Sequence, residues 1–150
     1  MSTCPCESGK PYSKCCEVYH LGTPAPSAEA LMRSRYSAYA LAAQNPVLID
    51  YLLQSWHADT RPQSLNLSGD DATKWLGLQI KRHHNIDAEN AVVEFVARYK
   101  PADNPGGKAE RLHETSRFKR IDGRWYYVDG DYSYPPKTLP TKFYQVTYPS

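Results

Sequence analysis

The stretch WLGLQIKRHHNIDAENAVVEFVARY, residues 75–99, decides the fold because its apolar residues recur with a period of two. The alternating residues are Leu76, Leu78 and Ile80 in its first half and Val93, Phe95, Ala97 and Tyr99 in its second half. Alternation of this kind predicts two half-buried β-strands. Residues 87–90 predict a hairpin turn, and a two-residue loop at 88–89 pairs Ile80 with Ala97. In this register all the apolar residues share one face of the sheet.

A second hairpin is predicted in residues 111–130. Its turn is Asp122-Gly123, a dipeptide that favours the type I′ turn because both central residues need positive φ. This turn pairs Ile121 with Arg124 and, counting back along the strands, Phe118 with Tyr127. Strands over 111–121 and 124–130 therefore extend the first hairpin into an antiparallel meander.

Two helices are predicted before the sheet. Ser27 suits the cap position of the first helix, and apolar residues recur at helical spacing from Leu31 to Ala43. Asn45 and Pro46 predict the start of a second helix, with Asn45 as its cap and Pro46 in the first helical position. Helices followed by an antiparallel meander define the α+β class.

Length and composition indicate one globular domain with a small appendage. The chain has 150 residues, a formal net charge of +2 and a mean hydropathy of −0.65. No apolar stretch approaches the roughly 20 residues of a membrane span, and residues 1–10 lack the apolar core of a secretory signal. The near balance of charges gives no strong nucleic-acid signal. We therefore expect a cytoplasmic protein.

All four cysteines lie in the first sixteen residues, where Cys4, Cys6, Cys15 and Cys16 form the pattern C-x-C-x8-C-C. Stabilising disulfides close loops along a chain, whereas this cluster is local, so the pattern predicts a single metal site. Four thiolates suit one Zn²⁺ in a closed tetrahedral site, which is structural because no coordination position stays open. His20 is either an alternative ligand or a helix-end residue. Unliganded thiols and a redox role are the other interpretations.

The segment CPCESGKPYSKCC, residues 4–16, resembles the SEC-C zinc motif, known from the end of the SecA translocation ATPase. The four cysteines match its ligand positions, and Ser8, Gly9, Lys10 and Tyr12 match its S-G-K-x-aromatic core. Glu7 departs from the motif, which usually has glycine at this position. The resemblance implies a zinc knuckle and, as protein partners, a secretion chaperone or the ribosome.

The rest of the chain resembles the YchJ-like family of small bacterial proteins. The matching segments are LMRSRYSAYAL (31–41), Trp56-His57, WLGL (75–78), FVARY (95–99), ETSRF (114–118) and WYYVDGD (125–131). The resemblance implies a nuclear-transport-factor-2-like domain, a cone-shaped antiparallel sheet backed by helices, with no assigned activity. We therefore divide the chain into a zinc-binding motif at 1–22, the main domain at 27–131 and a Pro/Tyr-rich tail at 132–150.

A candidate pocket lies on one face of the second hairpin. In the predicted register this face carries Glu114, Ser116, Phe118, Trp125, Tyr127 and Asp129. Carboxylates among aromatic rings are typical of a small polar pocket, although a β-bulge would exchange the two faces. His84, on the apolar face opposite Val93, is placed to form an acid–base pair with Glu114 or Asp129. In the alternative interpretation His84 lies at the edge of the core and Glu114 pairs with Arg33 or Arg35.

Two classes of function follow. The first, which the specificity of the motif favours, is a zinc-binding adaptor that contacts a protein partner through the knuckle. The alternative is a small-molecule-binding protein, or a dehydratase- or isomerase-type enzyme, that uses the pocket. The sequence leans against an enzyme because it has no nucleophile elbow, phosphate loop or HExxH motif. A homodimer through the open face of the sheet is a further expectation from the resemblance.

Overall fold

The computed structural model describes residues 3–65, 74–100 and 108–134, with the backbone alone for 132–134. The elements in chain order are a 3-10 turn η1 (Tyr12–Lys14), helices α1 (Cys16–His20), α2 (Ala28–Leu41) and α3 (Val47–Gln54), and strands β1 (Lys74–Asn85), β2 (Asn90–Lys100), β3 (Glu110–Ile121) and β4 (Arg124–Tyr134). The strands form one antiparallel sheet in the order β1-β2-β3-β4. The predicted α+β class is therefore confirmed. The predicted tail lies outside the described residues from 135 onward.

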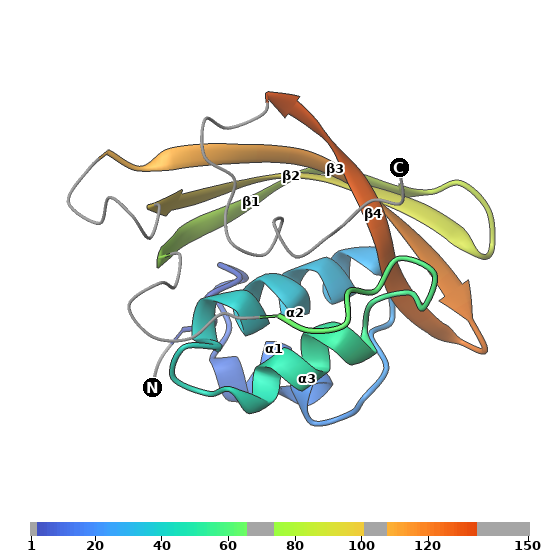
Figure 1. Ribbon diagram of the computed structural model, residues 1–150, viewed down its shortest axis with the longest axis horizontal. Coiled ribbons are helices and arrows are strands. Elements are labelled where there is room, and N and C mark those ends of the chain that lie inside the picture. The colour runs from blue at the N-terminus through green and yellow to red at the C-terminus, as the bar shows by residue number, and fades with distance from the viewer. Residues whose placement is uncertain (1–2, 66–73, 101–107, 135–150) are drawn as a thin grey trace.

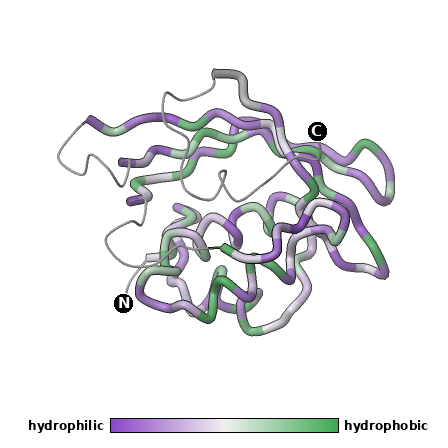
Figure 2. The backbone as a smooth tube through the Cα atoms, viewed as in Figure 1, coloured by the Kyte–Doolittle hydropathy of each residue, from purple (hydrophilic) through white to green (hydrophobic). Residues whose placement is uncertain are grey.

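The helices cover one face of the curved sheet, and α2 lies closest to it (Figure 1). Contacts join α2 to β1, β2 and β4. Hydrophobic and hydrophilic segments alternate along the strands, as expected for a sheet with one covered face (Figure 2). The core between the two layers includes the fully buried side chains of Phe95, Tyr99, Leu112 and Phe118. Burial of each such side chain stabilises the fold by about 1.5–3 kcal/mol.

The two helix starts differ in how they are capped. The hydroxyl of Ser27 accepts a hydrogen bond from the amide of Ala30 at 3.1 Å, which confirms Ser27 as the cap of α2. The prediction that Asn45 caps α3 is wrong, because the cap position is Pro46 and no side chain bonds there. Pro46 already has helical dihedrals, φ −61° and ψ −17°. Asn45 contributes only its carbonyl, which accepts from the amide of Leu48.

The register of the first hairpin differs from the prediction. Ile80 pairs with Phe95 rather than Ala97, partly because an irregularity at residues 80–82 shifts the pairing along β1 by one residue. The turn is also longer than two residues, since the last pair before it joins Asn85 to Ala91. The prediction that His84 lies on the apolar face opposite Val93 is consequently wrong. His84 pairs with Val92 and is exposed.

The second hairpin keeps the predicted register near its turn. The pairs Ile121 with Arg124 and Phe118 with Tyr127 are confirmed. A bulge between Arg117 and Phe118 then shifts the pairing, so that Arg117 faces Asp129. Beyond the bulge, the residues of β4 exchange faces relative to the prediction.

Candidate metal centre and polar core

The sulfur atoms of Cys4, Cys6, Cys15 and Cys16 all lie within 4.8 Å of one another. The Sγ atoms of Cys6 and Cys15 are 3.6 Å apart, and those of Cys15 and Cys16 are 4.0 Å apart. A tetrahedron with zinc–sulfur bonds of about 2.3 Å has sulfur atoms about 3.8 Å apart. The four cysteines are free of disulfides, and all but the half-buried Cys15 are buried. Their chemistry and spacing therefore fit a tetrahedral metal ion.

Two tight turns and one helix bring the cysteines together. The amide of Cys4 donates to the carbonyl of Lys10 at 2.9 Å, which closes the loop after the first cysteine pair. Within this loop Glu7 has φ 62° and Gly9 has φ 87°. Positive φ favours glycine, which explains why a motif of this kind has glycine where this chain has Glu7. Cys16 begins α1, so the second pair spans the helix start.

Hydroxyl groups surround the sulfur atoms. Ser8 Oγ lies 3.1 Å from the Sγ of Cys15, and Ser37 Oγ lies 3.2 Å from that of Cys16 and 3.3 Å from that of Cys4. Ser37 is a residue of α2 and is fully buried. Hydroxyl donors next to thiolates orient metal ligands and stabilise their negative charge.

The thiols influence one another's ionisation. Hydrogen bonds from Cys16 and then Cys4 hold the pKa of the Cys6 thiol far below its usual value. Hydrogen bonds with Cys4 and Cys6, together with burial, raise the pKa of the Cys16 thiol. Burial also raises the pKa of Cys15. The cluster thus accommodates one thiolate readily, and a bound cation would supply the charge that the other thiolates need.

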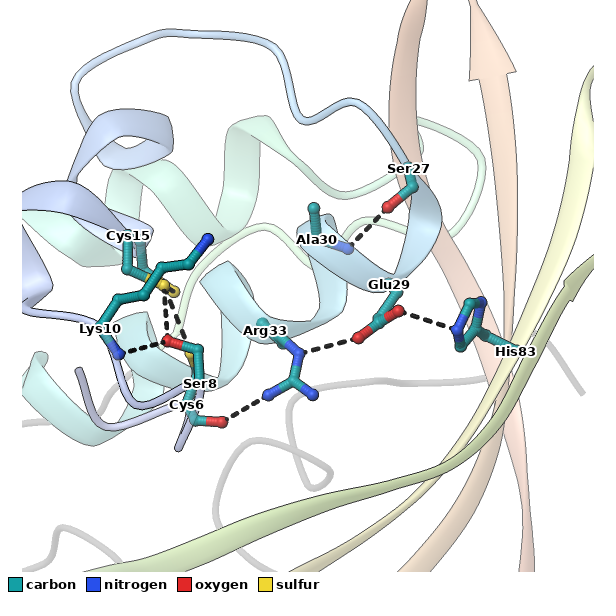
Figure 3. Close-up of polar contacts among 10 residues, drawn as sticks. Cys6, Ser8, Lys10, Cys15, Ser27, Glu29, Ala30, Arg33 and His83 are labelled. Carbon is teal, nitrogen blue, oxygen red and sulfur yellow. Dashed lines mark hydrogen bonds and ion pairs between the residues drawn. The ribbon is translucent and has the colours of Figure 1, made fainter. Parts of the chain in front are cut away.

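Ion pairs and hydrogen bonds attach the cysteine loop to the main domain. Arg33 of α2 donates to the carbonyl of Cys6 at 2.8 Å and to the carboxylate of Glu29 at 3.0 Å (Figure 3). The same carboxylate contacts His83 of β1 at 2.9 Å (Figure 3). On the other side, the carboxylate of Glu7 accepts from the amide of Leu78 at 2.8 Å. The cysteine loop is therefore fixed to both layers of the fold.

His20 lies outside the metal centre. Its Nε2 donates to the carbonyl of Ser34 at 2.8 Å, so its Nδ1 accepts from the hydroxyl of Tyr12 at 2.6 Å. Burial disfavours the imidazolium and lowers the pKa of His20, in agreement with this neutral form. These contacts favour the interpretation of His20 as a helix-end residue.

The three residues of the candidate pocket, Glu114, Asp129 and His84, do not lie together in the structure. Glu114 points into the core and is 1% exposed. Asp129 lies on the opposite face of the sheet, where its carboxylate contacts the guanidinium of Arg117 at 2.5 Å. His84 is exposed near the end of β1. The expectation that these residues share a face is wrong, because both hairpins contain bulges.

Glu114 instead belongs to a polar cluster that is buried in the core. The hydroxyls of Ser116 and Tyr127 donate to Glu114 Oε2 at 2.8 and 2.9 Å. The buried guanidinium of Arg35 lies over the rings of Trp56 and Tyr127, at 4.9 and 4.7 Å from their centroids. Arg35 donates to the carbonyl of Leu52 and to the hydroxyl of Ser55 rather than to Glu114. The alternative pairing of Glu114 with Arg33 or Arg35 is therefore also wrong.

A small cavity lies at the centre of this cluster. Its volume of about 10 Å³ has room for about one water molecule. Glu114 Oε1 and Trp56 Nε1, whose residues both line it, are buried without a hydrogen-bond partner. The sequence offered one signal for this cluster. Arg35 lies four residues from both Leu31 and Tyr39, and therefore on the apolar face of its helix.

Two solved structures have similar folds. One, a SEC-C motif containing protein from Rhodopseudomonas palustris, has a TM-score of 0.68 and 30% identity, and the match covers 85% of this chain and 96% of that protein. The other, a SEC-C motif containing protein from Psychrobacter arcticus, has a TM-score of 0.67 and 27% identity, with 91% and 86% covered. The fold and the cysteine cluster thus define a class, small proteins that join a SEC-C motif to a helix-backed curved sheet.

Comparison with protein families identifies the family within this class. The family model of the YchJ middle NTF2-like domain matches residues 27–130. A UPF0225 protein from Chromobacterium violaceum is 55% identical over 136 residues, covering 86% of this chain and 92% of that protein. One from Polaromonas is 51% identical over 137 residues, covering 85% and 91%. The chain belongs to the YchJ-like UPF0225 family.

Among the described residues, no helix is long and apolar enough to cross a membrane. The homodimer and the cytoplasmic location stay predictions.

Proposed function

We propose that this chain is a zinc-binding adaptor whose knuckle, residues 3–20, contacts a protein partner. In this proposal Cys4, Cys6, Cys15 and Cys16 hold one structural Zn²⁺. The observation that carries the proposal is the difference between the two sides of the knuckle. Its inner side is fixed to α2 and β1, whereas Ser8, Gly9, Lys10, Ser13 and Lys14 on its outer loop are exposed.

A loop held in this way suits recognition. The metal and the contacts of Arg33 and Glu7 restrict its conformation before a partner arrives, which lowers the entropic cost of binding. Lys10 and Lys14 give the loop a positive charge that favours an acidic partner surface. The SEC-C resemblance makes a secretion chaperone and the ribosome the first candidates.

The test places a photo-crosslinking residue at Ser13 of the outer loop or, as a matched control, at exposed Ala88 in the β1–β2 turn. Native mass spectrometry first establishes whether each protein holds one zinc ion. Each protein is then irradiated with the purified chaperone or with ribosomes. We expect an adduct from position 13 that disappears on chelation, and none from position 88. Equal adducts from both positions, or an adduct that survives zinc removal, would contradict the adaptor role.

The sequence-based alternative, a binding protein or enzyme built on His84, Glu114 and Asp129, receives less support. These residues lie on different faces, and the cavity beside Glu114 has room for about one water molecule.

A further inference from the structure

Several charged side chains on the outer face of the sheet, away from the helices, have partners of opposite charge. The pairs are Arg117 with Asp129 and Asp131, and Glu94 with Arg82 and His113. Opposite charges on neighbouring strands stabilise a sheet, whereas like charges directly opposite each other destabilise it.

Arg98 and Arg111 depart from this arrangement. They lie directly opposite each other on β2 and β3, so their side chains point to the same side of the sheet. Both are exposed. Within the described part of the chain, no carboxylate lies within ion-pair distance of either guanidinium. Two adjacent guanidinium groups that form no ion pair with a described carboxylate are suited to hold an anion.

The two arginines line a hollow of about 510 Å³. The other lining residues are Glu7, Gly77, Leu78, Gln79 and Val96. Val96 is buried beneath the hollow, at 5% exposure. The Glu7 carboxylate occupies the space beside Gly77, where a Cβ would overlap Glu7 Oε2 and lie 3.8 Å from Arg98 Nη1. The volume is within the range of about 300–1,000 Å³ found for small-molecule sites.

Further charges around the hollow are mostly positive. Lys74 and Lys100 form the last pair of β1 and β2, and Lys100 lies two residues beyond Arg98 on the same face. Neither lysine is in an ion pair with a described residue. The one lining carboxylate among the described residues, that of Glu7, accepts from the amide of Leu78. This end of the sheet therefore attracts anions.

We propose that the hollow binds a phosphate monoester, with its phosphate between Arg98 and Arg111. Each guanidinium presents a planar fork of donors that matches two phosphate oxygens. The two positive charges of the adjacent guanidinium groups balance the two negative charges of a phosphate monoester. A monocarboxylate has one negative charge, which one arginine balances. The hollow is larger than a phosphate group, so it has room for the organic part of a monoester as well. One lining residue, Glu7, belongs to the knuckle, but this proposal does not rest on the adaptor role.

The test is an NMR titration of the zinc-loaded full chain in a phosphate-free buffer at constant ionic strength. The probes are inorganic phosphate, glycerol 3-phosphate as the monoester, and acetate as a monocarboxylate. We expect saturable shifts of the Arg98 and Arg111 side-chain Nε–H signals and of the Gly77 and Val96 amides. The dissociation constant for inorganic phosphate is expected on the order of 1 mM, with tighter binding of the monoester and no saturation by acetate.

Substitutions assign the site. R98Q and R111Q should each weaken phosphate binding by at least about tenfold, since each removes charge-assisted hydrogen bonds. R120Q, at another exposed arginine of β3, is the matched control and should bind as the wild type does. E7Q should bind more tightly because it removes the carboxylate that lines the hollow. Unsaturable shifts, saturable binding of acetate, or unchanged binding by R98Q and R111Q would overturn the proposal.

Discussion

Removal of the bound metal is expected to open the knuckle while the α+β domain stays folded. The contacts that attach the knuckle are those of Arg33 with the Cys6 carbonyl, Glu7 with the Leu78 amide, and Ser37 with two sulfur atoms. A hydrogen bond contributes about 0.5–1.5 kcal/mol, or about 1.5–3 kcal/mol when one group is charged. The Ser37 hydroxyl has one proton and donates to one sulfur at a time, so it counts as one hydrogen bond. Allowing also for the exposure of Glu7, these contacts together contribute about 3–6 kcal/mol.

The core includes three cysteines of the knuckle, but most of its residues belong to the helices and the sheet. Its largest buried side chains, those of Trp56, Phe95, Tyr99 and Phe118, all lie outside the knuckle. For a chain of this size, 1 kcal/mol corresponds to about 2–4 °C in Tm. We therefore expect chelation to lower Tm by about 10–20 °C and to leave a cooperative transition.

Calorimetry and hydrogen exchange on the zinc-loaded and chelated protein measure the two effects. Amides of residues 4–16 should lose protection on chelation, while those of residues 91–99 and 112–118 keep it. C15S, which removes the most exposed ligand, should resemble the chelated protein. Loss of protection throughout the sheet would show that the metal folds the whole chain, as in small zinc fingers. Unchanged protection of residues 4–16 would show that the cysteine cluster holds the knuckle without a metal.

Three further substitutions test the structure by chemical denaturation. S116A removes a hydroxyl that donates to the buried carboxylate of Glu114, so it should lower the free energy of unfolding by about 1.5–3 kcal/mol. The loss should be smaller in an E114Q background, and an equal loss in both backgrounds would refute a charge-assisted bond. G130A should lower the free energy of unfolding by about 1–3 kcal/mol, because the new Cβ would overlap the Glu114 carboxylate, which Ser116 holds in place. An unchanged stability would show that this carboxylate lies elsewhere. E7A should be about 1 kcal/mol less stable than E7G, because both variants lose the hydrogen bond to Leu78 but only alanine is strained at φ 62°. Equal stabilities would argue against the left-handed conformation at residue 7.

The sequence predicted the sheet best close to the turn of the second hairpin. Asp122-Gly123 fixes the pairing of Ile121 with Arg124, and the register counted from there is correct as far as Phe118 and Tyr127. A bulge adds a residue to one strand and inverts every side chain beyond it, so Asp129 points outward. Bulges have no strong side-chain signature, but an isolated glycine in a strand is a sign of one. Gly77 adjoins such an irregularity in β1.

The two sites differ in how far the sequence could reveal them. The cysteine cluster was predictable because its ligands lie within thirteen residues and one loop brings them together. The polar cluster of the core combines Arg35 from α2, Trp56 after α3, and Glu114 and Tyr127 from two strands. Its geometry depends on tertiary packing and on the bulge in the second hairpin, which no local pattern specifies.

Glu7 shows why the knuckle is part of the fold rather than an appendage joined by a linker. β1 is an edge strand, and the amide of Leu78 donates a hydrogen bond to the carboxylate of Glu7. An unprotected edge presents free amides to other chains. Glu7 follows Cys6 directly and holds a left-handed conformation that glycine would adopt more readily. The loop that holds Cys6 thus positions a side chain that covers part of the sheet edge, so the cysteine cluster and the sheet are joined directly.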